Sequence, residues 1–168
     1  PLLRFIGPMY SNLIEFNPET DDANDIRGDL AESWEMAEDG LTYTFHLVEN
    51  ARWHDGEPLT SDDVMFSFLS MTCPDCIEVM EGQRRNRILF RKNIDLDGSR
   101  AVDPFTVEIK TKFPSPDFIS QLAMDVNKIV PEHVASKILQ TAKVPEELVG
   151  SGPFKYVNLT KAVGYEHE

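Results

Sequence analysis

The clearest pattern in the chain is an alternation of apolar and polar side chains over residues 41–48. Strongly apolar residues alternate there with threonine, histidine and valine, which is typical of a strand with one buried face. Residues 32–36 alternate in the same way around Trp34. The intervening Asp39-Gly40 has turn chemistry, because glycine reaches a positive φ without steric cost. The sequence therefore predicts an antiparallel hairpin that, with Trp34, seeds the core.

A helix is predicted after this hairpin, beyond a turn at Asp55-Gly56. Thr60 and Asp63 have the spacing of a capping box, with acidic residues in the first helical turn. The positions that follow at helical spacing are apolar: Val64, Phe68 and Met71, with Met65 and Leu69 beside them. Pro74 ends the helix, because the residue before a proline is pushed out of the helical region.

The flanking regions contain shorter elements. The apolar residues before Ile14 fit one helical face that Gly7-Pro8 interrupts, so a broken or late-starting helix is expected. Residues 13–16 are expected to form a short strand and residues 21–28 a surface loop. The stretch from Cys76 to Ala101 lacks a clear pattern apart from a turn at Asp97-Gly98.

The C-terminal half adds a strand, two helices and a further strand. Residues 105–109 alternate like a strand after a turn at Asp103-Pro104. Ser115 is expected as a helix N-cap with Pro116 at the first helical position, and Pro131 begins another helix. A hinge-like turn at residues 151–153 precedes a strand over residues 154–159. This order lacks steady βαβ alternation, so we expect an antiparallel α+β domain.

Composition narrows the function classes. The chain has 168 residues, 41% of them hydrophobic, which is enough for one globular domain. No apolar run reaches the about 20 residues of a membrane span. The net charge of -13 argues against general nucleic-acid binding, which needs a basic face. An acidic stretch over residues 15–39 and a basic run over residues 84–92 are either solvated surface or paired with each other or with a neighbouring lobe.

Catalytic motifs are scarce. The chain has no Gly-rich phosphate loop, HExxH or GxSxG motif. His46 is expected on the polar face of its strand, and His54 is expected to form an ordinary local hydrogen bond beside Asp55. We therefore expect neither a catalytic residue nor a cofactor.

Cys73-Pro74-Asp75-Cys76 is the one motif with possible chemistry. A CxxC motif can be a redox pair, half of a zinc site or a small disulfide. A second CxxC or an HxxxH is absent from the sequence, and Cys73 follows a predicted helix rather than beginning one. The residues thus favour a local disulfide or two free thiols, with a thiol-redox or metal protein as the alternative.

Several motifs occur in a fixed order along the chain: LAESWE at 30–35, DGLTYTFHL at 39–47, ARWHDGEPLTSDDV at 51–64, IVPEHV at 129–134 and GSGPF at 150–154. With this order and spacing, the chain resembles the family-5 extracellular solute-binding proteins, the peptide- and nickel-binding receptors of ABC importers. Members of this family have two lobes that close on a ligand. The resemblance implies that residues 1–150 are an N-terminal α+β subdomain of a longer receptor and that residues 151–168 begin the return segment to its main lobe. The start at Pro1 and the end after a strand-like run also suggest a fragment.

The resemblance further implies an extracytoplasmic receptor, periplasmic or tethered as a lipoprotein, that passes peptides or related solutes to an ABC permease. An oxidising compartment favours a disulfide between Cys73 and Cys76. The matching residues identify no ligand contact, and Gly152 and Phe154 are the cleft-side candidates. We expect a monomeric fragment that binds no nucleic acid. The alternative of a stand-alone interaction module would require the gene to stop near Glu168.

Overall fold

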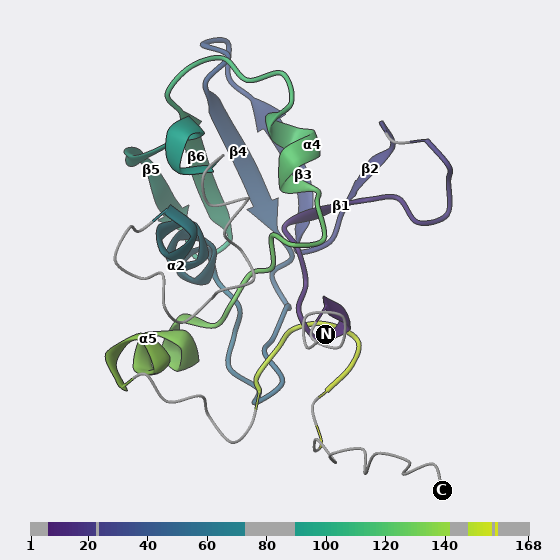
Figure 1. Cartoon of the computed structure of the whole chain (residues 1–168), viewed down its shortest axis with the longest axis vertical. Coiled ribbons are helices and arrows are strands. Elements are labelled where there is room, and N and C mark those ends of the chain that lie inside the picture. Colours follow the sequence, from purple (N-terminus) through teal and green to yellow (C-terminus); the bar gives the residue numbers. More distant parts are fainter. Residues whose placement is uncertain (1–6, 23, 73–89, 142–147, 156, 158–168) are drawn as a thin grey trace, which may run out of the picture.

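A computed structural model describes residues 7–22, 24–72, 90–141, 148–155 and 157 (Figure 1). Its centre is an antiparallel sheet of four strands in the order β3-β4-β6-β5. The strand bounds are β3 Ala31–Met36, β4 Thr42–Leu47, β5 Ile94–Asp103 and β6 Thr106–Thr111.

The predicted hairpin is confirmed. Strands β3 and β4 pair with Trp34 opposite Phe45, and Gly40 in the turn has a φ of 66°. Tyr43, Phe45 and Leu47 are buried, as their alternation predicted. Trp34 is partly buried and packs against the same core.

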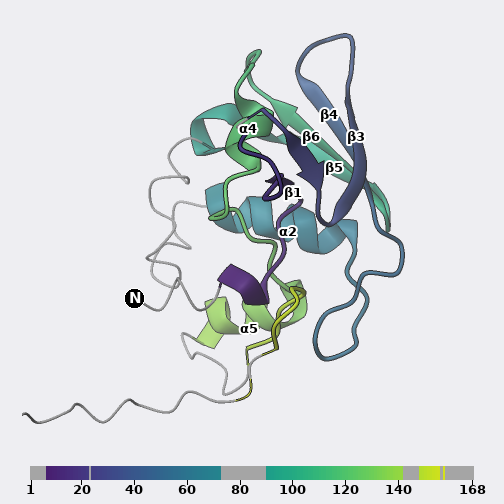
Figure 2. The ribbon, with the colours of Figure 1, turned by 90° about the vertical axis from the view of Figure 1, so that its right-hand side faces the viewer.

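Two helices cover one face of the sheet (Figure 2). Helix α2 runs over Ser61–Thr72 and helix α4 over Phe118–Leu122. The predicted stripe of α2 is buried at Val64, Phe68 and Met71, whereas Leu69 is exposed. The Tyr43 ring of β4 pairs with the Phe118 ring of α4, with centroids 4.8 Å apart. Phe90 in turn pairs with Phe118 and with Phe68 of α2. Such pairs add to the stabilisation from apolar burial.

The start of α4 differs from the prediction. Asp117 rather than Ser115 is the N-cap, and Pro116 lies before the helix. The Ser115 carbonyl instead accepts a hydrogen bond from the Phe118 N–H at 3.0 Å, so a turn precedes the helix. The buried face of Phe118, Leu122 and Ala123 is confirmed. Helix α5, over Glu132–Thr141, begins directly after Pro131 as expected.

Two strands of the structure, β2 and β5, were not predicted from the sequence. Residues 26–28 form β2 (Ile26–Gly28), which pairs with β1 (Ile14–Phe16), so the expected loop over residues 21–28 is wrong at its end. Asp97-Gly98 lies within β5, where the pairing register jumps between Asp95 and Arg100. It is a bulge in a strand rather than a turn between elements.

The ends of the described chain lie close together. A 3-10 helix, η1, spans Gly7–Met9, so Gly7-Pro8 lies within a helical turn instead of interrupting one. Residues 10–13 are not helical, so the expected helix is wrong there, and residues 1–6 lie outside the described residues. Residues 154, 155 and 157 are not in a strand, so the expected final strand is wrong there. The described helices include none long and apolar enough to cross a membrane. The predicted α+β class is confirmed.

Candidate functional site

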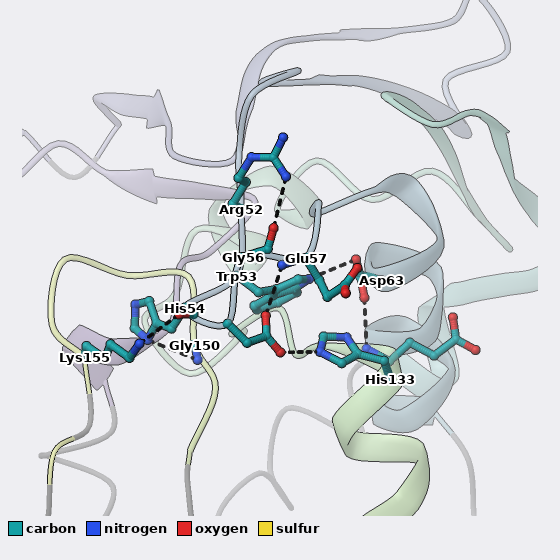
Figure 3. Close-up of polar contacts among 11 residues, drawn as sticks. Arg52, Trp53, His54, Gly56, Glu57, Asp63, His133, Gly150 and Lys155 are labelled. Carbon is teal, nitrogen blue, oxygen red and sulfur yellow. Dashed lines mark hydrogen bonds and ion pairs between the residues drawn. The ribbon is translucent and has the colours of Figure 1, made fainter.

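The loop over residues 52–57 joins the sheet to α2 and is closed by its own backbone. The Trp53 N–H donates to the Glu57 carbonyl at 2.9 Å, and the Gly56 N–H donates to the Trp53 carbonyl at 2.9 Å. The Trp53 side chain is 2% exposed, and its Nε1 donates to Oδ2 of Asp63 at 3.1 Å (Figure 3). The loop is therefore fixed to the first turn of α2.

Asp63 connects three segments. Its Oδ2 also accepts the Thr60 N–H at 3.0 Å, which is the predicted capping bond. Its Oδ1 accepts the Glu132 N–H at 2.9 Å, in the first turn of α5. A carboxylate is favoured there by the positive end of the helix dipole. The sequence identified the cap but gave no signal for the bonds to Trp53 and Glu132.

His54 contacts the return segment instead of its own loop, so the expected local hydrogen bond is wrong. The His54 N–H donates to the Gly150 carbonyl at 2.8 Å, and the Gly150 N–H donates to Nδ1 of His54 at 3.3 Å (Figure 3). Nε2 lies 2.8 Å from the Gly152 carbonyl. A neutral ring with its proton on Nε2 satisfies both side-chain bonds, because Nδ1 accepts and Nε2 donates.

Asp55 extends the loop's contacts to α5. One carboxylate oxygen lies 2.7 Å from Nε2 of His133. Burial acts to raise the pKa of Asp55, but hydrogen bonds from His133 and from the Glu57 N–H outweigh it, so the pKa lies below its usual value.

The two ligand-facing candidates lie in the return segment. The Gly152 N–H donates to the Met9 carbonyl at 2.9 Å, and the Phe154 N–H donates to the Pro8 carbonyl at 3.3 Å. A Cβ on Gly152 would lie 2.5 Å from the Pro8 carbonyl oxygen, so close backbone packing requires glycine there. The Phe154 side chain is 64% exposed. Their role as ligand contacts stays a prediction.

A hollow of about 610 Å³ opens beside the contacts between the return segment and residues 8–9. Pro8, Pro18 and Pro153 line it, and its polar lining comes from distant segments: Tyr10, Ser11, Glu15, Arg27, Asp29, Asp125 and Lys128. The sequence gave no signal for it, because residues more than a hundred positions apart form its wall.

Most charges around the hollow are paired. Arg27 contacts Glu15 at 2.8 Å and Glu19 at 3.5 Å. Lys128 contacts Asp125 at 2.6 Å. Oδ2 of Asp29 accepts the Asn12 N–H at 2.7 Å. Burial raises the pKa of Asp29, because it disfavours the charged carboxylate.

The described residues contain no group of three or more His, Cys, Asp and Glu side chains placed to hold a metal ion. Cys73 and Cys76, the residues of the predicted disulfide, lie outside the described residues.

Comparison with known proteins gives a consistent result. The chain matches the family described as bacterial extracellular solute-binding proteins, family 5 middle, over residues 25–167. It is 32% identical over 167 residues to the dipeptide-binding protein of Escherichia coli (strain K12), covering 88% of this chain and 29% of that protein.

Solved structures show the same fold. The periplasmic binding protein DppA of Helicobacter pylori, in complex with the peptide STSA, matches with a TM-score of 0.73 and 27% identity, covering 92% of this chain and 32% of that one. NikZ of Campylobacter jejuni, in complex with Ni(L-His), matches with a TM-score of 0.73 and 28% identity, covering 93% and 29%. The chain thus spans only about three tenths of the length of these relatives.

Proposed function

Because the chain belongs to family 5 of the bacterial extracellular solute-binding proteins, we propose that it is part of a receptor that captures peptides or related small solutes and delivers them to an ABC importer. The family match over residues 25–167 carries this proposal. The family consists of binding proteins rather than enzymes, as the sequence predicted.

The chain spans only part of the length of its relatives, so it would supply only part of a ligand-binding site. A subdomain that supplies about three tenths of a receptor would form one wall of a ligand cleft, and the other lobe would close over it. We assign the subdomain to residues 1–150 and the return to the main lobe to residues 151–168, with Gly152 and Phe154 on the cleft side. The contacts of His54 with Gly150 and Gly152 support a fixed exit from the subdomain.

The ligand class is tested by calorimetry on the full-length product of the gene that encodes these residues. Dipeptides and short peptides should bind saturably, and the 168-residue chain alone should bind them weakly or not at all. Because one relative was solved with a peptide and another with Ni(L-His), both ligands are titrated. Binding of neither by the full-length protein, or tight peptide binding by the chain alone, would contradict the proposal.

Membership of this family is also the basis for proposing where the receptor is located and whether its two cysteines form a disulfide. We place the receptor outside the cytoplasm, in the periplasm or tethered to the membrane as a lipoprotein, with Cys73 and Cys76 joined as a disulfide. Cell fractionation and thiol counting under native and denaturing conditions test these points. Bound metal or thiol-exchange activity that disappears on double substitution with serine would favour the thiol-redox or metal alternative. A gene that stops near Glu168 would favour a stand-alone module.

A further inference from the structure

Asp29 differs from the other charged residues of the hollow. Arg27 and Lys128 each have an acidic partner, and these partners include Glu15 and Asp125. Among the described residues, no basic side chain lies within ion-pair distance of Asp29. Its Oδ2 accepts the Asn12 N–H, and the Ser11 side chain also hydrogen-bonds to the carboxylate.

The surroundings of Asp29 make this lack of a cation costly. The side chain is half-buried, and removing a carboxylate from water without an opposite charge is unfavourable. Lys128 is near enough to act on the Asp29 charge, but its ammonium contacts Asp125 at 2.6 Å. A cation that entered the hollow would therefore gain a partner without displacing an ion pair.

The hollow has the size and lining for such a group. Its volume of about 610 Å³ falls within the range of small-molecule sites. Tyr10 also lines it, and an aromatic ring attracts an ammonium or guanidinium group. Pro8 and Pro153 supply apolar surface for the alkyl part of a basic side chain.

We propose that Asp29 in this hollow binds the cationic group of a captured solute, an ammonium or guanidinium group on a basic peptide or amino-acid derivative. The inference rests on the proposed function only in taking the cation to be part of a captured solute. The residues that line the hollow all lie within the 168-residue chain, so binding of a cation there can be tested on this chain alone.

The test is an NMR titration of the 168-residue chain with acetyl-arginine amide, which carries one positive charge. Acetyl-citrulline amide is its neutral counterpart. We expect saturable shifts of the Asn12 and Asp29 amide signals with the cationic probe, in the millimolar range. The neutral probe should bind about tenfold more weakly. Equal binding of the two probes, or no saturable shift with either, would overturn the proposal.

Asp29→Asn is the matching variant. Its amide oxygen can still accept the Asn12 N–H, so the backbone contact is kept while the charge is removed. It should reduce affinity for acetyl-arginine amide about tenfold. Glu49→Gln, at an exposed position, makes the same change in net charge and should bind within twofold of the natural chain. Equal losses in both variants would show a general charge effect and overturn the proposal.

Binding measurements on the full-length protein distinguish a failure of this site from a failure of the proposed function. Asp29→Asn should weaken binding of basic peptides more than that of neutral peptides. An equal effect on both would overturn the assignment of the cation to the solute. If the full-length protein bound no peptide but the chain still discriminated between the two probes, the cation site would stand and the proposed function would fall.

Discussion

The indole Nε1 of Trp53 donates a hydrogen bond to Oδ2 of Asp63 at 3.1 Å, and both residues are buried. The bond joins the loop over residues 52–57 to the first turn of α2. Because Oδ1 of the same carboxylate accepts the Glu132 N–H, α5 is held at the same point. Trp53 and Asp63 thus link the loop, α2 and α5 at one point, in addition to the contact of Asp55 with His133.

Trp53→Ala should destabilise the chain by about 3–5 kcal/mol, since it removes a large side chain from a site that is 2% exposed. Chemical denaturation of the 168-residue chain measures this cost. Trp53→Phe is the matched variant: it keeps an aromatic ring but loses the N–H, so its cost should be smaller. If Trp53→Ala left stability unchanged but abolished solute binding by the full-length protein, the residue would be a ligand contact.

Asp63→Ala should cost about 3 kcal/mol or more, because three donors lose a buried acceptor. Asp62 is a suitable control: it lies in the same helical turn but is exposed. Asp62→Ala should cost less than about 1 kcal/mol, the usual scale of a helix-dipole contribution. Urea denaturation of both variants tests the difference. Equal costs would show that the contacts of Asp63 with Trp53 and Glu132 add little.

The hairpin and α2 could be predicted because their signals are local and agree with one another. Alternation over residues 41–48, turn chemistry at Gly40 and the capping spacing of Thr60 and Asp63 all lie within a short stretch of chain. Strand β2 gave too little pattern in three residues. Strand β5 was obscured by Asp97-Gly98, whose turn chemistry is used in a bulge.

The candidate site was less predictable, because its contacts join distant positions. The ring of His54 meets a segment 96 residues further along the chain at Gly150. The hollow likewise brings Asp29 and Lys128 to one wall. Neither contact has a signature in local periodicity or turn chemistry. The family resemblance identified the class of protein, but it assigned no role to His54 or Asp29.

Gly150→Ala should loosen the return segment, because the added Cβ would overlap the Met9 carbonyl. We expect chymotrypsin to cleave after the exposed Phe154 about tenfold faster, in proportion to the population of the locally open form. Mass spectrometry identifies the site. Gly56→Ala serves as the control: its φ of 96° makes the substitution strained, but nothing lies within 4 Å of the added Cβ. It should reduce global stability without faster cleavage at Phe154; similar acceleration in both variants would count against the packing argument.

The pairing of Asp55 with His133 should make stability depend on pH. The pKa of Asp55 is lower in the folded chain than its usual value, so the carboxylate stabilises the fold above the unfolded value of about 4 and loses this effect as the pH falls through the folded value. The difference in unfolding free energy between the natural chain and Asp55→Asn should therefore be largest above about pH 5 and shrink below about pH 3. Urea denaturation across this range measures it, with Glu49→Gln as the charge-matched control. A difference that stayed constant from pH 6 to pH 3 would mean that the ionised carboxylate of Asp55 does not stabilise the loop against α5.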